Sequence, residues 1–166
     1  VPGGQLVNSP TAQSLERCVL FHQNIIMLAN FEIEGSTALK YEGRHIDLHN
    51  NFDFIDYNYI STHQVLKITL AKSLGDWVDK TEYSKLTLIH YNVFFLNISY
   101  DNKEFQFPHD DKALADISFF PSSDRGINDR VTCQANPDKD DDIIYMFQSD
   151  HYIRVGCDKI ELITEL

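Results

Sequence analysis

The stretch Lys85–Phe120 constrains the fold of this chain most, because apolar and polar residues alternate along much of it. Phe105 and Phe107, for example, stand on either side of Gln106. A period of two places one set of side chains on each face of a β-strand. The turn-forming residues Asp101-Asn102-Lys103 interrupt the pattern, so the stretch predicts a β-hairpin. Since a hairpin this apolar is not stable alone, we expect it to pack against a second sheet.

Shorter versions of this pattern recur along the chain between clusters of turn-forming residues. We expect strands within residues 18–33, 37–48, 63–70, 113–120, 143–155 and 159–166, with a turn at Glu42-Gly43 inside the second of these ranges. The last two should form a closing pair. Residues 18–33 also fit a buried helix, and residues 50–58 fit a structured loop or an irregular strand. We expect a loop at 73–79 that presents Trp77, and a long solvated loop at 122–142. Short, regularly spaced strands predict an all-β sandwich or barrel.

Charge disfavours two classes of partner. The chain has 25 acidic and 14 basic residues, which gives a formal net charge of −11. Such a surface repels phosphate backbones and anionic lipid headgroups. No apolar run is long enough to span a bilayer. We therefore expect no nucleic-acid partner and no membrane insertion.

The length of 166 residues fits one domain. We expect a flexible lead-in at residues 1–14 and a single β-sandwich domain at 15–166, with 134–166 as a C-terminal extension that closes the sheet. Cys133 and Cys157 flank the acidic loop and could form a disulfide, although reduced thiols are the favoured interpretation. The compartment stays open, with an extracellular or secreted location favoured over a cytoplasmic one.

The order of these signals resembles that of the galectins, over roughly residues 15–133. The quoted segments are His22–Ile26 on an early strand, Leu48–Phe54 (LHNNFDF), Gly75-Asp76-Trp77 on a loop, and the hairpin segment Asp101–His109 followed by Leu114. The resemblance implies a jelly-roll β-sandwich of two antiparallel sheets. It also implies non-catalytic binding of a β-galactoside, with a tryptophan that stacks on the sugar.

The chain departs from the galectin pattern at its charged positions. Asp53 stands where galectins have an arginine, and Lys80 and Glu82 nearly reverse the acidic residue and arginine that follow the tryptophan. His49 and Asn51 match the pattern, as does Trp77. The ionic network that holds the galactose hydroxyls is therefore not carried over, and the resemblance supports the fold more than the ligand.

A candidate ligand-binding set nevertheless emerges. It consists of His49, Asn51, Asp53, Trp77 and Glu82. If residues 49, 51 and 53 alternate on one strand, their side chains share a face. A loop tryptophan offers a flat apolar surface to a sugar ring. The competing interpretations are a solvated outer sheet face and a tryptophan that folds back against the core.

We therefore expect a non-enzymatic recognition module, without a cofactor, whose partner is a glycan or a glycoprotein. The alternative keeps the β-sandwich without sugar binding. In that case the chain is a protein–protein interaction domain of a larger or secreted protein that faces a host or a pathogen.

A third hypothesis is a metal-dependent oxygenase. On a strand, His45, Asp47 and His49 share a face, and two histidines with one carboxylate can hold a transition metal. A distal histidine would come from His90, His109 or His151. No suitably spaced basic residue follows these histidines to hold an oxoacid, so histidines on a polar surface are the favoured interpretation.

Overall fold

The computed structural model describes residues 26–99 and 112–166. Within them the chain is mostly β, with three largely antiparallel sheets, almost no helix and no closed barrel. The all-β prediction is thereby confirmed, whereas the described residues form three sheets instead of the two that were expected. The expected lead-in at residues 1–14, the turn at 101–103 and the strand residues Phe105 and Phe107 lie outside the described residues.

The largest sheet has five strands in the order β1-β12-β7-β6-β5. Their bounds are β1 Leu28–Ala29, β12 Lys159–Glu165, β7 Lys85–Tyr91, β6 Val65–Lys72 and β5 Phe52–Ile60. Only β1 and β12 run parallel among these pairs. The register of β5 against β6 shifts between Phe54 and Asp56, so from Phe52 onward the irregular strand, one of the two alternatives for residues 50–58, is the one that forms.

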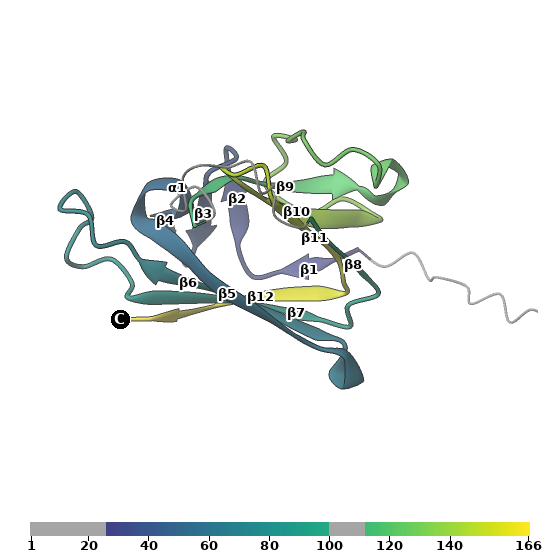
Figure 1. Cartoon of the computed structure of the whole chain (residues 1–166), viewed down its shortest axis with the longest axis horizontal. Coiled ribbons are helices and arrows are strands. Elements are labelled where there is room, and N and C mark those ends of the chain that lie inside the picture. Colours follow the sequence, from purple (N-terminus) through teal and green to yellow (C-terminus); the bar gives the residue numbers. More distant parts are fainter. Residues whose placement is uncertain (1–25, 100–111) are drawn as a thin grey trace, which may run out of the picture.

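Two smaller sheets complete the fold. The four-stranded sheet has the order β8-β11-β10-β9, with β8 Phe95–Ile98, β11 Tyr152–Gly156, β10 Asp141–Phe147 and β9 Leu114–Pro121. The three-stranded sheet contains β2 Glu32–Glu34, β3 Ala38–Tyr41 and β4 Arg44–Asp47. The short helical elements are α1 Leu48–Asn51, η1 Ser61–His63 and η2 Ser122–Asp124. Figure 1 shows the five-stranded sheet as one layer, with the two smaller sheets above it.

Alternating side chains from these layers meet in one hydrophobic core. Leu66 and Ile68 of β6 are buried, as are Leu88 of β7 and Ile143 and Phe147 of β10. Each fully buried aliphatic or aromatic side chain contributes roughly 1.5–3 kcal/mol relative to exposure. The period of two therefore reports the core-facing residues correctly in these strands.

A buried polar bridge crosses this core. His90 of β7 is fully buried, and its Nδ1 lies 3.2 Å from the carbonyl oxygen of Leu66. Its Nε2 lies 2.9 Å from the hydroxyl of Tyr145 on β10. Because a carbonyl only accepts, Nδ1–H donates to Leu66, and a neutral imidazole then accepts the Tyr145 hydroxyl at Nε2. Burial lowers the pKa of His90 to about 4, which favours this neutral form.

For two of the predicted strand segments, the strands form but pair with different partners than expected. The stretch that begins at Lys85 is not one long hairpin arm, because β7 ends at Tyr91 and β8 begins in the other sheet at Phe95. Asn92 makes this turn with a φ of 53° in an otherwise apolar run. The expected closing pair is also wrong, since residues 143–155 contain the β10–β11 hairpin, whereas β12 pairs with β7. Alternation shows which residues face a core but does not show which sheet they join.

The predicted hairpin within residues 37–48 and two further predicted strands are confirmed. Residues 37–48 contain the β3–β4 hairpin, which turns at Glu42 and Gly43 with positive φ at both. Strands β6 and β9 lie at the expected places. In the described residues, no helix has the length and apolarity to cross a membrane.

Candidate functional site

Trp77 lies in the loop between β6 and β7, and 71% of its surface is exposed. Its indole Nε1 donates to the carbonyl oxygen of Asn50 at 2.9 Å. Its ring lies directly over Gly75, where even a Cβ atom would come within 2.3–2.4 Å of three ring atoms. Glycine therefore makes this ring position possible. The alternative in which Trp77 folds back against the core does not fit its exposure.

Glu82 organises the polar groups beside this loop. Its Oε2 accepts a hydrogen bond from Asn51 Nδ2 at 3.2 Å. Its Oε1 accepts from Arg44 Nη2 at 2.8 Å and from the backbone N–H of Tyr83 at 3.0 Å. The carboxylate is nearly buried, and bonds from charged or polar donors to an ionised carboxylate are stronger than neutral ones. Glu82 therefore fixes Asn51 and Arg44 in place.

Arg44 is held from three sides and is still partly open to solvent. Its guanidinium also donates to the carbonyl oxygen of Thr81 at 3.0 Å. The same group lies 4.3 Å from the centroid of the Tyr83 ring, a distance at which cation–π attraction operates. About a third of the Arg44 side chain, 34%, is exposed. We call the set Arg44, Asn51, Trp77 and Glu82 the Trp77 surface.

The backbone around the Trp77 surface is fixed by further hydrogen bonds. Ser73 N donates to the carbonyl oxygen of Asn51 at 2.8 Å, which joins the loop to the end of α1. Asp79 Oδ1 accepts from Thr81 N and Oγ1 at 2.7 and 2.8 Å, and these bonds lower the pKa of Asp79. Lys72 Nζ donates to the Asp79 carbonyl oxygen at 2.6 Å. The surface is therefore organised without a ligand.

The prediction that His49, Asn51 and Asp53 share one strand face is wrong. Residues 48–51 form a helical turn, which Asp47 caps by accepting from Asn50 N at 3.0 Å. Residues two apart on a helix do not face each other. His49 accordingly turns away, and its Nδ1 donates to the carbonyl oxygen of Leu114 at 2.7 Å. Asp53 belongs to β5 instead.

The structure thus brings together three of the five predicted residues. Asn51, Trp77 and Glu82 are joined through the helical turn and the loop, whereas His49 and Asp53 are not part of that set. Sequence reasoning missed Arg44, which supplies the cation from β4. One signal was present, because Arg44 is the only arginine between residues 18 and 124.

The residues of the metal hypothesis have separate partners. His45 Nδ1 lies 2.6 Å from Glu34 Oε2, Asp47 caps α1, and His49 bonds to β9. Of the possible distal histidines, His90 lies in the core, and His109 is outside the described residues. Among the residues that the structure describes, no group of three or more His, Cys, Asp or Glu could hold a metal ion.

The loop at 122–142 is solvated as its composition predicts, because residues 122–140 are exposed or half-buried, but one buried side chain anchors it to the sheet. Arg154 of β11 is fully buried and donates from Nη1 and Nη2 to the carbonyl oxygens of Ile127 and Pro121, at 2.9 and 2.8 Å. Its Nε donates to Asp142 Oδ2 at 2.9 Å. One buried guanidinium therefore ties the loop to the outer face of the four-stranded sheet.

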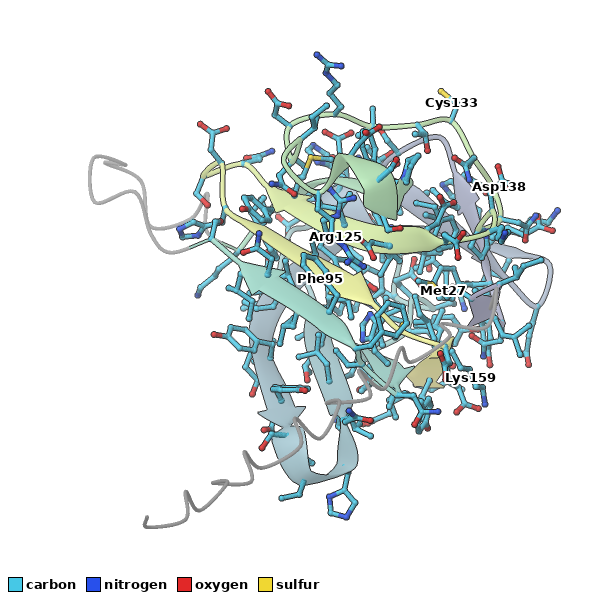
Figure 2. All side chains as sticks on the ribbon, turned by 90° about the vertical axis from the view of Figure 1, so that its right-hand side faces the viewer. Met27, Phe95, Arg125, Cys133, Asp138 and Lys159 are labelled. Atoms are coloured by element: carbon cyan, nitrogen blue, oxygen red, sulfur yellow. The ribbon has the colours of Figure 1, made fainter. Side chains whose placement is uncertain are left out.

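A second arginine completes this cluster. Arg125 donates from Nε and Nη2 to the two carboxylate oxygens of Asp142, at 2.9 and 2.8 Å. Its guanidinium lies 3.7 Å from the centroid of the Phe95 ring, and Figure 2 shows these two side chains together over the sheet. Cys133 is exposed and Cys157 is buried, and both are free thiols, so the disulfide considered between them is not formed.

Comparison with family models, with curated proteins and with solved structures gives no match for this chain. The geometry of its own residues therefore carries the functional proposal.

Proposed function

We propose that this chain is a non-catalytic recognition domain that binds a carbohydrate, presented as a glycan or on a glycoprotein, at the Trp77 surface. The exposed, fixed indole of Trp77 is the observation that supports this most. Exposure of the apolar indole to water is unfavourable, and a sugar ring can cover it by placing its CH groups on the indole face.

The polar neighbours fit the hydroxyl groups of such a ligand. The guanidinium of Arg44 and the amide of Asn51 are planar groups with hydrogen-bonding capacity, and both are oriented by Glu82. A few fixed polar groups around an apolar surface are typical of ligand sites. Glu82 itself is nearly buried and already accepts three hydrogen bonds, so its role is to position Arg44 and Asn51.

We also infer that the fold is a divergent galectin-like jelly roll. Stacked antiparallel sheets support this inference, as does the position of Trp77 on a loop beside Asn51. Two departures define the divergence. The segment that carries His49 is a helical turn, and the arginine beside the site comes from β4 ahead of that segment.

Glycan-array binding of the intact chain tests the proposal, followed by titration of Trp77 fluorescence with the best glycan. We expect Trp77→Ala to lose binding and Trp77→Phe to retain a weakened part of it. Leu74→Ala is the matched control, because Leu74 lies in the same loop and is 98% exposed. A blank array, or equal binding by wild type and Trp77→Ala, would refute the proposal.

A second candidate function is protein recognition along β5. This strand is at the edge of the five-stranded sheet, and Ile55, Tyr57 and Tyr59 are exposed large hydrophobic residues on it. Edge strands pair readily with an extended segment of another chain. Under this alternative, a partner captured from deglycosylated lysate is lost with the double variant Tyr57→Ser, Tyr59→Ser and kept with Trp77→Ala. Capture that requires intact glycans would contradict it.

A further inference from the structure

A cavity of about 590 Å³ lies beside the four-stranded sheet. Its lining residues are Phe94, Pro121, Ser122, Ser123, Arg125, Lys139, Asp140, Asp141, Cys157 and Asp158. Four segments form it: Phe94 between β7 and β8, the end of β9 with η2 and the residue after it, the start of β10 with the two residues before it, and the turn between β11 and β12. Its volume is within the usual range for a small-molecule site.

The cavity is separate from the Trp77 surface. Ser84, immediately before β7, donates from its backbone N–H to the carbonyl oxygen of Glu165 at the end of β12. At the other end of these paired strands, Asp158 N donates to the carbonyl oxygen of Tyr91. The loop of Trp77 precedes Ser84, whereas the cavity includes Asp158. The two sites therefore lie at opposite ends of a seven-residue strand, about 20 Å apart along it.

The inner wall of the cavity is already fixed. Arg125 is held between the ring of Phe95 and the carboxylate of Asp142. A Cβ atom on Gly156 would lie 2.7 Å from both Asp142 Oδ1 and a Phe94 ring carbon, and 3.1 Å from Arg125 Nη2. Because only glycine fits there, the wall is tightly packed, and a ligand would not have to order it.

The lining offers donors and acceptors together. Arg125 and Lys139 are cationic, the hydroxyls of Ser122 and Ser123 donate or accept, and three aspartates supply acceptor oxygens. The formal charges of the lining are two positive and three negative, a sum of −1. Behind the wall, Asp142 and Arg154 cancel each other. The lining therefore has no excess of positive charge to attract phosphate or other anions. A neutral ligand rich in hydroxyl groups can bind both its hydrogen-bond donors and its acceptors.

We propose that this cavity is a second carbohydrate-binding site, for a neutral monosaccharide or disaccharide. The cavity chemistry by itself selects a neutral polyhydroxy ligand, and the choice of a sugar rests on the proposed function. The hydroxyl groups would bind the carboxylates and Arg125, and Pro121 would contact the apolar part of the ring. A chain with two such sites at opposite ends of one sheet can hold two parts of a branched glycan or two glycans.

The chain offers a matched pair of variants for the test. Asp140 and Asp150 both have a φ of 63°, which glycine adopts without strain. Asp140→Gly removes a carboxylate from the cavity lining, and Asp150→Gly makes the same change in charge and backbone freedom in the β10–β11 turn outside it. Any effect of unfolding or net charge would appear in both variants.

The experiment titrates the intact chain with a panel of neutral monosaccharides and disaccharides, followed by calorimetry and by amide NMR shifts. We expect shifts at Ser122, Arg125 and Asp158, at least tenfold weaker binding with Asp140→Gly, and unchanged binding with Asp150→Gly. Trp77→Ala should keep these cavity shifts.

Other outcomes separate the two proposals. If Trp77→Ala removes all sugar binding and Asp140→Gly changes nothing, the cavity proposal is overturned and the proposed function stands. If no sugar of the panel shifts the cavity residues of the wild type, the cavity proposal is overturned, while the proposed function is decided separately by the glycan array. Shifts of the cavity residues with inorganic phosphate or with a free amino acid, but not with sugars, would overturn the ligand class.

Discussion

Two arginine–carboxylate pairs in this chain share their chemistry and differ in burial. The side chains of Arg154 and Asp142 are 0% exposed, whereas those of Arg44 and Glu82 are 34% and 6% exposed. Both arginines also lie over an aromatic ring, Phe120 for Arg154 and Tyr83 for Arg44.

The difference lies in what the remaining donors of each guanidinium do. Arg154 donates to the backbone carbonyl oxygens of Pro121, Asp124 and Ile127, so its charge and its donors are used within the protein. Arg44 has one backbone partner besides Glu82 and stays partly open, on the same hydrogen-bonded set as an exposed indole. Burial therefore distinguishes an ion pair that stabilises the fold from an ion pair whose arginine can bind a ligand.

Replacing Arg154 tests the buried side of this comparison and should have the largest effect. Arg154→Met leaves the carbonyl oxygens of Pro121 and Ile127 without their donor, and leaves Asp142 with Arg125 alone. Breaking a buried ion pair in this way costs about 3–5 kcal/mol. Urea denaturation should show a loss of this size. Arg44→Met is the control and should lose at most about 1 kcal/mol; similar losses in both variants would contradict the comparison.

Acid should weaken the fold through His90, another fully buried group. The folded pKa of His90 is about 4, against 6.5 for the unfolded chain, so between these values the unfolded state binds a proton that the folded state does not. The contribution is fully present above pH 6.5 and decreases as the pH falls toward 4. At pH 4.5 the loss of this contribution should lower the free energy of unfolding by about 2.5 kcal/mol.

Denaturation of wild type and His90→Gln at pH 7 and pH 4.5 measures this contribution. The carboxylates titrate in both proteins, so the difference between their pH dependences isolates His90. We expect the wild type to lose about 2.5 kcal/mol more than the variant over this interval. Parallel losses in the two proteins would show that His90 does not titrate in this range.

Glu82→Gln tests the Arg44–Glu82 pair, with a smaller expected effect on stability. The amide keeps the shape of the side chain but loses the charge that Arg44 and Asn51 share. We expect a loss of about 1 kcal/mol in unfolding free energy, and about tenfold weaker glycan binding because Arg44 is no longer positioned. Glu165→Gln, in the exposed pair with Lys85, is the control and should change neither quantity. Unchanged binding with Glu82→Gln would remove Glu82 from the site.

The sequence predicted local features of this fold better than long-range ones. Alternation located β6 and β9, and Glu42-Gly43 marked the β3–β4 turn, because period and turn chemistry are local properties. No local pattern indicates that the chain leaves the five-stranded sheet at Asn92 and enters the four-stranded sheet at Phe95. Composition correctly predicted a solvated loop at 122–142, but it did not indicate that Arg154, a residue distant in sequence, anchors the loop.

The site was predictable only in part for the same reason. Trp77 was identified from a polar loop, which is a local signal. The helical turn at 48–51 is too short to show a helical period, so His49 was placed on the wrong face. Arg44 joins the site through Glu82, 38 residues away in the sequence, and no local pattern indicates that contact.

Gly75→Ala should have the smallest effect on stability and a large one on binding. The added methyl group would lie 2.3–2.4 Å from the Trp77 ring, so the exposed indole must move, while the core keeps all its contacts. Because surface substitutions usually change stability by less than about 0.5 kcal/mol, urea denaturation should be nearly unchanged. Trp77 fluorescence should shift and glycan affinity should fall about tenfold. Gly126→Ala, where a Cβ atom meets nothing within 4 Å, is the control. If Gly75→Ala shifts the fluorescence without weakening binding, the position of the indole does not matter to the ligand, and Arg44 and Asn51 alone would have to account for recognition.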